Sequence, residues 1–449
     1  MMEWDTVLMS RLITTLTLGF HIIFATIGVG VPLMITIAEF IGIKKKDRNY
    51  LLMARRWARG FVITVAIGVV TGTAIGLQLS LVWPNFMQVA GNVIALPLFM
   101  EVFAFFFEAI FLGIYLYTWD RFKNQWMHWI LSLPVVVGGA LSAMFITMVN
   151  GFMNTPQGFE IANGQFKAVD PIAAMLNPAT ASKVFHVVST AYLTVAAMLA
   201  AIAAFSILLR KATDYHKKAL KLMMFLVLLF SILSAVAGDV SAKFLAEHQP
   251  EKLAAAEWHF ETEKGADLIL FGWLNDDNEV VGEIRVPQFL SFLAFNDFQA
   301  EVIGLEAFPD DELPPLWIHY TFDFMVMIGF FLMSLSILYF IVHFMKRLDV
   351  HNKFILSLIV ASGPLAFIAI ELGWILAEEG RQPWILRGYM TVSEAATTSP
   401  YISLMFFLFL GLYIVLGVLC IVTLRKLFKN NPAEVELEKK FPLKREDGE

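Results

Sequence analysis

Long uninterrupted runs of apolar residues dominate the chain. A helix needs roughly 20 apolar residues to cross a hydrocarbon core of about 30 Å, and nine stretches approach or exceed that length. Strands of a membrane barrel would be shorter and would alternate in polarity, so these runs predict helices. They lie at about 13–38, 60–82, 93–118, 128–149, 184–209, 219–237, 317–345, 354–377 and 399–424.

The charges between these runs predict an orientation. Lys and Arg gather in every second connection, whereas the other connections are neutral or acidic. Because basic loops stay on the cytoplasmic side, we expect the N-terminus outside and the C-terminus inside. The basic residues concerned are Lys44, Lys45, Lys46, Arg48, Arg55, Arg56, Arg59, Arg210, Lys211, Lys217, Lys218, Lys221, Lys346, Arg347, Lys353, Arg425, Lys426 and Lys429.

The pattern divides the chain into four parts. Residues 1–238 hold the first six predicted spans and residues 317–425 the last three, followed by a cytoplasmic tail at 426–449. The segment 239–316 contains 17 acidic and four basic residues, a net charge of −13, and is predicted to be an outer loop. A loop of this length in a compact protein is usually functional or disordered.

Composition narrows the class further. The chain of 449 residues is 58% hydrophobic and 16% charged, against roughly 45–50% and about 25% in soluble domains. This excludes a soluble multidomain enzyme, a secreted disulfide scaffold and a disordered chain. The single cysteine, Cys420, excludes an internal disulfide and a Cys-x-x-Cys-His haem attachment. We therefore expect an all-α, polytopic integral membrane protein with about nine transmembrane helices.

Ionisable residues at membrane depth are candidates for function, because each charge costs at least about 2.5–3.5 kcal/mol to insert. Only His21 and His186 lie in predicted spans away from the cytoplasmic ends. His128, His319 and His343 are expected near span ends, where an imidazole can reach water. A lone intramembrane histidine more often forms a hydrogen bond between helices than a metal bond. The intramembrane carboxylates are Glu101, Glu108, Glu371 and Glu378, together with Asp323.

The rise of a helix places several candidate ligands at similar depth. With 1.5 Å per residue, His21, His186, Met325 and Glu378 all fall in the outer half of their spans. An imidazole with a thioether can hold a low-spin haem, and a histidine or carboxylate alone leaves a coordination position open for oxygen. One methionine among 21 is by itself a weak candidate.

Two carboxylate pairs share a spacing of seven residues. Glu101 with Glu108, and Glu371 with Glu378, lie almost two helical turns apart, which puts each pair on one face about 10 Å apart. A ladder of carboxyl groups leading from the inner side toward the outer half would suit a proton relay. A structural pair neutralised by protonation is the other interpretation.

One segment of the sequence is distinctive enough to be compared with a family signature. Residues 373–384 read Gly-Trp-Ile-Leu-Ala-Glu-Glu-Gly-Arg-Gln-Pro-Trp. This resembles the Gly-Trp-x-x-x-Glu-x-Gly-Arg-Gln-Pro-Trp signature of the haem-bearing large subunit, subunit I, of cytochrome bd-type quinol oxidases. The segment from Lys252 to Glu257 resembles the quinol-loop motif of that family, and Arg11 with His21 its first-helix pattern. The resemblance extends over essentially the whole chain and is to the branch with a short quinol loop.

The resemblance implies two b-type haems, one haem d and quinol as substrate, held by residues of this chain. His186 and Met325 would be the axial ligands of the low-spin b haem. His21 and Glu378 would each bind an iron of the high-spin pair, with no indication of which takes which haem. The other implied residues are Lys252 and Glu257 for quinol, Glu101 and Glu108 for protons, and Arg381 and Trp374 beside the cofactors.

The resemblance also implies the working assembly. We expect a bacterial cytoplasmic-membrane protein that pairs with a second polytopic subunit, and in some relatives with a small single-helix one. It would contact lipid, quinol and O2 but no nucleic acid. The family often has a basic residue two positions before the methionine ligand, where this chain has Asp323.

The resulting hypothesis is a terminal quinol:oxygen oxidoreductase. Quinol would be oxidised at the outer face and O2 reduced to water with protons from the cytoplasm, which generates proton motive force without a pump. Two alternatives remain from the residues alone. A proton-coupled secondary transporter would use the same carboxylates without haem, and a b-type electron carrier would have no oxygen-reactive centre.

Overall fold

The computed structural model describes residues 5–162, 165–209, 213–276, 279–345 and 349–442. Within them, nine helical segments are long and apolar enough to cross a membrane, which confirms the predicted helical class. Arg210, Lys211, Lys346, Arg347 and the end of the predicted tail lie outside the described residues. The nine spans are α1 (Thr6–Lys45), α2 (Arg48–Val82), α3 (Pro84–Tyr117), α4 with α5 (Gln125–Ile130 and Ser132–Asn154), α7 (Thr180–Leu208), α8 (Asp214–His248), α11 (Ile318–Met345), α12 (Lys353–Glu379) and α14 (Ile402–Asn430).

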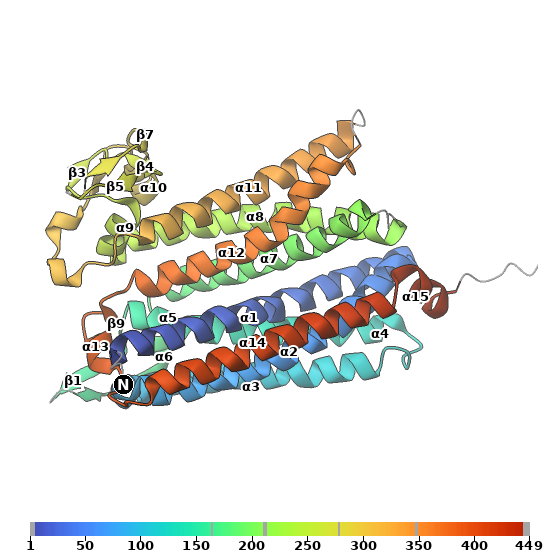
Figure 1. Cartoon of the computed structure of the whole chain (residues 1–449), viewed down its shortest axis with the longest axis horizontal. Coiled ribbons are helices and arrows are strands. Elements are labelled where there is room, and N and C mark those ends of the chain that lie inside the picture. Colours follow the sequence, from blue (N-terminus) through green and yellow to red (C-terminus); the bar gives the residue numbers. More distant parts are fainter. Residues whose placement is uncertain (1–4, 163–164, 210–212, 277–278, 346–348, 443–449) are drawn as a thin grey trace, which may run out of the picture.

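The spans form two adjoining groups (Figure 1). In the first bundle, α1 packs on α2 and α5, and α3 packs on α2 and α5, while α14 lies against α1 and α2. In the second bundle, α7, α8, α11 and α12 contact one another in a ring. The two bundles meet where α7 packs on α1 and α5 and where α8 packs on α2.

Small residues allow the helices of the second bundle to approach closely. Alanines such as Ala196, Ala197 and Ala200 of α7 are fully buried. A Cβ on Gly363 of α12 would lie only 2.8 Å from the Cβ of Ala201. Since lipid tails are as apolar as leucine, such close packing, rather than a hydrophobic effect, holds membrane helices together. The sequence supplies this contact through its run of small residues in α7.

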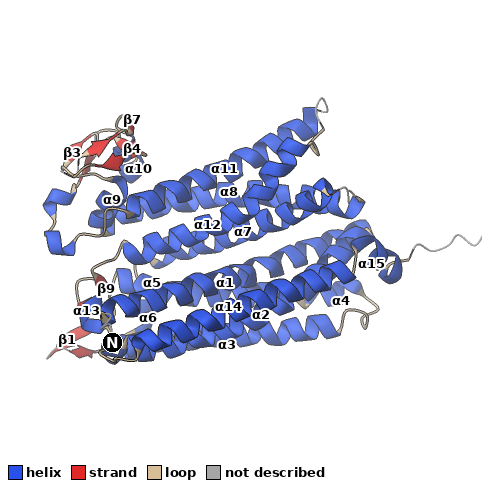
Figure 2. Cartoon of the chain, in the orientation of Figure 1, coloured by secondary structure: helices blue, strands red, loops and turns tan. Residues whose placement is uncertain are grey.

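The short elements lie mainly at one end of the molecule, here called the α9 end, where Figure 2 shows the strands. All strand pairs there are antiparallel and two-stranded. The helices and turns concerned are α6 (Pro171–Met175), α9 (Pro250–Glu257), α10 (Phe289–Phe295), η1 (Leu305–Ala307), η2 (Asp310–Glu312) and α13 (Val392–Ala395). The strands are β1 (Glu160–Ala162), β2 (Gln165–Lys167), β3 (Glu263–Lys264), β4 (Leu268–Leu270), β5 (Trp273–Leu274), β6 (Val280–Val281), β7 (Ile284–Val286), β8 (Glu301–Val302), β9 (Trp384–Leu386) and β10 (Met390–Thr391).

The acidic segment is folded and begins later than the charge pattern predicts. Helix α8 continues to His248, so the first ten residues of the expected 239–316 loop are helical. An ion pair of 2.5 Å between Asp239 and Lys243, one helical turn apart, lets the helix continue through polar residues. Likewise α14 runs to Asn430, past the predicted boundary at residue 425.

The opposite end, here called the α15 end, is closed by the C-terminal tail. Helix α15 (Ala433–Lys440) carries the buried Glu436, which accepts hydrogen bonds from Arg56 and Arg59 of α2. The Arg48 guanidinium donates to the carbonyl of Phe441 at 3.1 Å. These bonds dock the tail against the turn between α1 and α2.

Candidate functional site

His186 and Met325 both lie in the second bundle, each opposite a glycine. His186 is on α7, and a Cβ on Gly238 of α8 would lie 3.8 Å from its Cε1. Met325 is on α11, and a Cβ on Gly373 of α12 would lie 3.0 Å from its sulfur. Within the described part of the chain, the buried Nδ1 of His186 has no hydrogen-bond partner. Two potential ligands, each with a neighbouring position free of side chain, suit a flat group between the helices.

One ring nitrogen of His21, on α1, is hydrogen-bonded within the protein. Its Nδ1 lies 2.8 Å from the hydroxyl of Thr71 on α2. That hydroxyl donates its hydrogen to the carbonyl of Ile67 at 3.0 Å, so it accepts from His21 Nδ1. The tautomer fixed in this way leaves Nε2 without hydrogen, which is the form that binds a metal. Gly72 again leaves room, since a Cβ there would lie 3.3 Å from His21 Cε1.

Glu378 lies at the end of α12 in a polar cluster between the two bundles. Its Oε1 accepts from the Asn150 amide of α5 at 2.6 Å, and its Oε2 from Arg381 at 2.7 Å. Lys183 of α7 donates to the other side of the Asn150 amide at 2.8 Å. A carboxylate oxygen has two lone pairs, so Glu378 retains acceptor capacity beyond these bonds. Trp374 lies one turn earlier on α12 and is half-buried.

Lys183 is a member of this cluster that sequence reasoning did not single out. It lies three residues before His186, at the start of an apolar run, and a lysine in that position usually marks only the end of a span. Its bond to Asn150 depends on the packing of α7 against α5. Only that packing shows it to be part of the site.

Helix α9 holds Lys252 against the same cluster. Pro250 begins the helix and three alanines continue it, both favourable choices for a short helix. Lys252 is 4% exposed, and its ammonium group donates to the carbonyl of Ala377 at 3.0 Å, next to Glu378 in the chain. A Cβ on Gly380 would lie 2.6 Å from Lys252 Cε, so only glycine leaves space for the lysine there.

Glu257 lies at the other end of α9 and faces α11. Trp258 ends the helix with φ +49°, stacks on His319 of α11 at 3.9 Å, and donates to the Leu316 carbonyl at 2.8 Å. His319 Nδ1 in turn donates to the Ala256 carbonyl at 2.7 Å. Glu257 is 3% exposed, and its Oε2 has no hydrogen-bond partner among the described residues. The three alanines of α9 pack in one apolar cluster with Met325.

Burial shifts the acidity of both residues of α9. Burial, together with the positive charge of Arg381, lowers the pKa of Lys252 to about 7, with a partial offset from the carboxylate of Glu378. Burial raises the pKa of Glu257 well above its usual value, and the carboxylate of Asp323 adds to this. The lysine can therefore exchange a proton near neutral pH, and the environment of the glutamate favours its protonated form.

Glu101 and Glu108 lie on α3 against α5. Glu101 accepts a hydrogen bond of 3.0 Å from Ser142. Glu108 is 3% exposed and packs against Gly138. A Cβ on Gly138 would lie only 2.8 Å from the Cβ of Glu108. The Oε1 of Glu108 has no hydrogen-bond partner among the described residues. Glu371 of α12 is separate from this pair and lies beside Gly19 of α1.

Two expectations about histidines are wrong. His128 and His319 are not exposed at the span ends, because they are 3% and 0% exposed and each is hydrogen-bonded inside the protein. The sequence also did not mark Glu39, which lies just beyond the predicted first span, at 13–38. In the structure α1 continues to Lys45, and Glu39 is 2% exposed and bonded to His128. Tertiary contacts provide the partners that make these burials possible.

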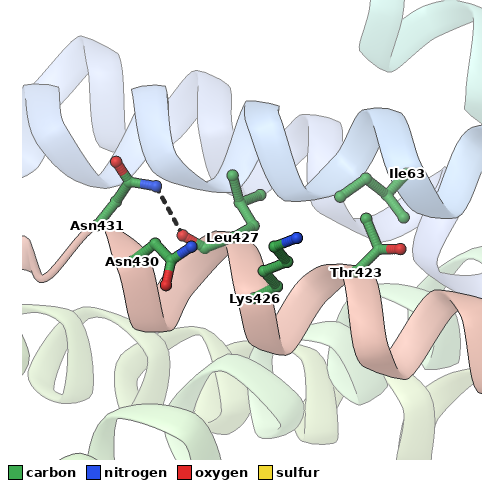
Figure 3. Close-up of a pocket in the computed structure, with 6 residues that line it drawn as sticks. All are labelled: Ile63, Thr423, Lys426, Leu427, Asn430 and Asn431. Carbon is green, nitrogen blue, oxygen red and sulfur yellow. Dashed lines mark hydrogen bonds between the residues drawn. The ribbon is translucent and has the colours of Figure 1, made fainter.

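One open groove lies away from all of these residues. It has a volume of about 300 Å³ and runs between α2 and α14 at the α15 end. Figure 3 shows that the side chains of α14 form most of its wall. Its lining residues are Ile63, Thr423, Lys426, Leu427, Asn430 and Asn431. None of the predicted site residues is among them.

Fold and site together define a polytopic helical membrane protein with histidine, methionine and carboxylate side chains buried between its spans. The model of the family described as cytochrome bd terminal oxidase subunit I matches residues 9–432. A putative cytochrome bd menaquinol oxidase subunit I of Bacillus subtilis is 41% identical, covering 96% of this chain and 99% of that protein. A cytochrome bd ubiquinol oxidase subunit 1 of the same organism is 31% identical, covering 90% and 89%. The solved bd oxidase of Geobacillus thermodenitrificans is 60% identical with a TM-score of 0.93, covering 96% of this chain and 100% of that one.

The chain belongs to the cytochrome bd terminal oxidase subunit I family. It is therefore a quinol oxidase subunit and a multi-pass protein of the cell membrane. Membership of this family implies haem cofactors, and subunit I normally pairs with a subunit II. These findings confirm the resemblance seen in the signature at residues 373–384 and stand against the transporter alternative.

Proposed function

We propose that this chain oxidises quinol at the α9 end, on the outer face, and supports reduction of O2 to water with protons taken up from the α15 end. The observation that carries the proposal is the position of α9. Its alanines belong to the apolar cluster on which Met325 packs, while its Lys252 bonds next to Glu378. One short helix thus lies beside both groups of candidate ligands.

The low-spin b haem would be held by His186 and Met325. The glycines opposite both side chains and the unpartnered His186 nitrogen fit such a group. With an imidazole and a thioether both supplied by this chain, a haem held here would supply electron transfer rather than oxygen binding. This supports a place for it next to the quinol site rather than at the oxygen site.

The high-spin pair, one b haem and one haem d, would be held by His21 and Glu378. The free Nε2 of His21 and the remaining lone pairs of Glu378 suit iron binding. Arg381 already binds Glu378, and its planar guanidinium suits carboxylates such as those of haem propionates. Trp374, one turn before Glu378 on α12, would line the same site. When bound, the haems supply the electron transfer and the reduction of oxygen.

Lys252 and Glu257 would handle the quinol hydroxyls. A lysine with a pKa of about 7 can take up a proton from quinol, whereas a protonated glutamate can orient the substrate by hydrogen bonding. The two side chains lie five residues apart on α9 and face α12 and α11, respectively. Protons released here would leave on the outer face.

Glu108 and Glu101 would deliver the protons that oxygen reduction consumes. Both lie on one face of α3, with Glu108 nearer the α15 end. Uptake at one face and release at the other would separate charge without a pump. The basic loops near the α15 end support its assignment to the cytoplasmic side.

The first experiment is a reduced-minus-oxidised visible spectrum of the purified oxidase, repeated with carbon monoxide. We expect a low-spin b band together with a far-red band that responds to carbon monoxide. A normal b band without the far-red band would contradict the presence of haem d. Folded protein without haem would contradict the whole proposal.

The acidity of Lys252 gives a pH prediction. Because the folded-state pKa is lowered to about 7, the lysine is protonated and unable to accept a proton below that pH, and neutral above it. We expect quinol oxidation to rise with pH through about 7. Lys252→Arg, which stays charged, should abolish this rise. Oxygen consumption with an artificial electron donor is the control, and an unchanged pH profile in the variant would exclude this role.

A further inference from the structure

Three buried side chains form a closed network at the α15 end. Glu39 of α1, Tyr115 of α3 and His128 of α4 are each at most 3% exposed. The Tyr115 hydroxyl donates to Glu39 Oε2 at 2.7 Å, and His128 Nδ1 lies 2.5 Å from Glu39 Oε1. His128 Nε2 lies 2.9 Å from the backbone carbonyl of Tyr115. The proposed quinol and haem sites use none of these residues.

The chemistry of the bonds shows that Glu39 and His128 share a proton. A carbonyl oxygen only accepts, so the Nε2 of His128 must carry a hydrogen. The hydrogen bond between His128 Nδ1 and Glu39 then contains one proton, which either of the two groups can hold. It belongs either to an imidazolium beside a carboxylate or to a carboxylic acid beside a neutral imidazole. The pair can therefore take up or release a proton without breaking its other hydrogen bonds.

The pair borders a small cavity with room for water. A cavity of about 30 Å³ is lined by Glu39 and His128 together with Trp119, Phe122 and Phe441. A water molecule needs about 10–15 Å³ and two or more polar partners, and the cavity offers both. It lies beneath the docked tail, at the end of the molecule that carries the basic loops.

One face of α3, here called the stripe, carries Tyr115 and Glu108, with the apolar Phe111 and Leu112 between them. Tyr115 lies seven residues after Glu108 on α3, the same spacing as Glu101 to Glu108, so all three share one face. On α1, the Thr36 hydroxyl donates to the carbonyl of Pro32 at 2.9 Å, one turn from Glu39. The distance from Tyr115 to Glu108 is about 10 Å along the helix.

Pro32 also leaves a backbone carbonyl near Glu108 free to accept a hydrogen bond. Proline has no N–H, so the Gly28 carbonyl one turn earlier lacks its helical hydrogen bond. That carbonyl oxygen and Glu108 Oε2 each lie 3.3 Å from the position that a Cβ on Gly139 would occupy. The two oxygens thus face the same small space, where a protonated Glu108 or a water molecule could donate to the carbonyl.

We propose that the pair of Glu39 and His128, with Tyr115, is the intake that passes protons from the α15 end to Glu108. This rests on the proposed function of Glu108 as a proton relay. A proton from cavity water enters the pair and continues along the stripe, with water molecules bridging the gap to Glu108. For each proton passed on, the Tyr115 hydroxyl donates its hydrogen to the bridging water, takes one from Glu39, and then turns back to donate to Glu39, which restores the starting network.

A structural role alone explains the network less well. Well-packed apolar side chains often replace a buried ion pair at no cost in stability. A purely structural contact would need neither a proton that both groups can hold nor a cavity with room for water beside it. Both features are what a proton intake requires.

The test uses the oxidase isolated with its second subunit and supplied with an artificial electron donor. Glu39→Gln keeps the shape of the side chain but cannot take up a proton. We expect proton uptake and oxygen consumption to fall by about 100-fold, as for loss of a proton-transferring group, with the haem spectrum unchanged. The slowing should be larger in D2O than for the unaltered oxidase, and Glu39→Asp should recover part of the rate.

The matched control is Glu436→Gln. Glu436 is also a buried carboxylate at the α15 end, but it is held by Arg56 and Arg59 outside the stripe. We expect its turnover to be unchanged. Equal slowing in Glu436→Gln would mean that Glu39→Gln acts by disturbing this end of the molecule, and would overturn the inference.

A parallel Glu108→Gln variant separates the inference from the proposed function. If it slows proton uptake and Glu39→Gln does not, the intake is elsewhere and only the inference fails. If neither variant slows uptake, the Glu108 relay fails as well. Should Glu39→Gln not assemble with its haems, His128→Gln decides by the same measurements, because it keeps a hydrogen-bond donor but cannot take up a proton.

Discussion

Replacing His186 with alanine is expected to remove the low-spin haem signal completely while the protein remains inserted in the membrane. His186 is half-buried, and its Nδ1 makes no hydrogen bond in the described structure, so the substitution breaks no hydrogen bond of that nitrogen. An iron that loses one of two axial ligands changes its spin state or is lost. The reduced-minus-oxidised spectrum of the purified variant measures this directly.

Met325→Leu should have the same spectral effect for the same reason. Leucine is close to methionine in volume, so packing against α9 should change little. The matched control is Met327→Leu on the same helix, where the side chain is 41% exposed. An unchanged low-spin band in Met325→Leu, or equal loss in Met327→Leu, would refute the assignment of Met325 as a ligand.

Glu257→Ala is expected to lower quinol oxidation by about 100-fold, in the range for loss of a group that assists proton transfer. The side chain is 3% exposed at the end of α9, with one carboxyl oxygen unpartnered in the described structure. That oxygen is available to a substrate hydroxyl. The measurement is oxygen consumption with quinol as the donor, compared with an artificial electron donor.

The comparison of donors decides what the loss means. If Glu257 acts on quinol, the artificial donor should still support oxygen consumption in the variant. Equal loss with both donors would place the role of Glu257 beyond quinol oxidation. Glu261→Ala provides the control, because Glu261 is an exposed carboxylate at the same α9 end, four residues further along the chain.

Periodicity and charge predicted the architecture well, and for a physical reason. A hydrocarbon core requires long apolar helices with their backbone groups bonded internally, so each span leaves a clear mark in the sequence. The nine runs correspond to the nine spanning helices of the described structure. The ends of the helices were predicted less accurately. Polar residues at interfaces can continue a helix, as Asp239 and Lys243 do in α8.

The candidate ligands were also visible in the sequence, because ionisable residues at membrane depth are rare. His21, His186, Glu101, Glu108 and Glu378 stood out in this way. Met325 did not, since the sequence pattern does not distinguish one methionine among 21. Only the family resemblance pointed to it.

The sequence by itself thus determined the number of spans, the charge of the loops and the short set of buried ionisable groups. Only the tertiary structure decided which of these groups meet. Lys252 bonds beside Glu378, and Glu39 pairs with His128, across gaps of 125 and 89 residues. Such contacts depend on how helices rotate and pack, and packing is set by small residues such as Gly138 and Gly373 that periodicity does not distinguish.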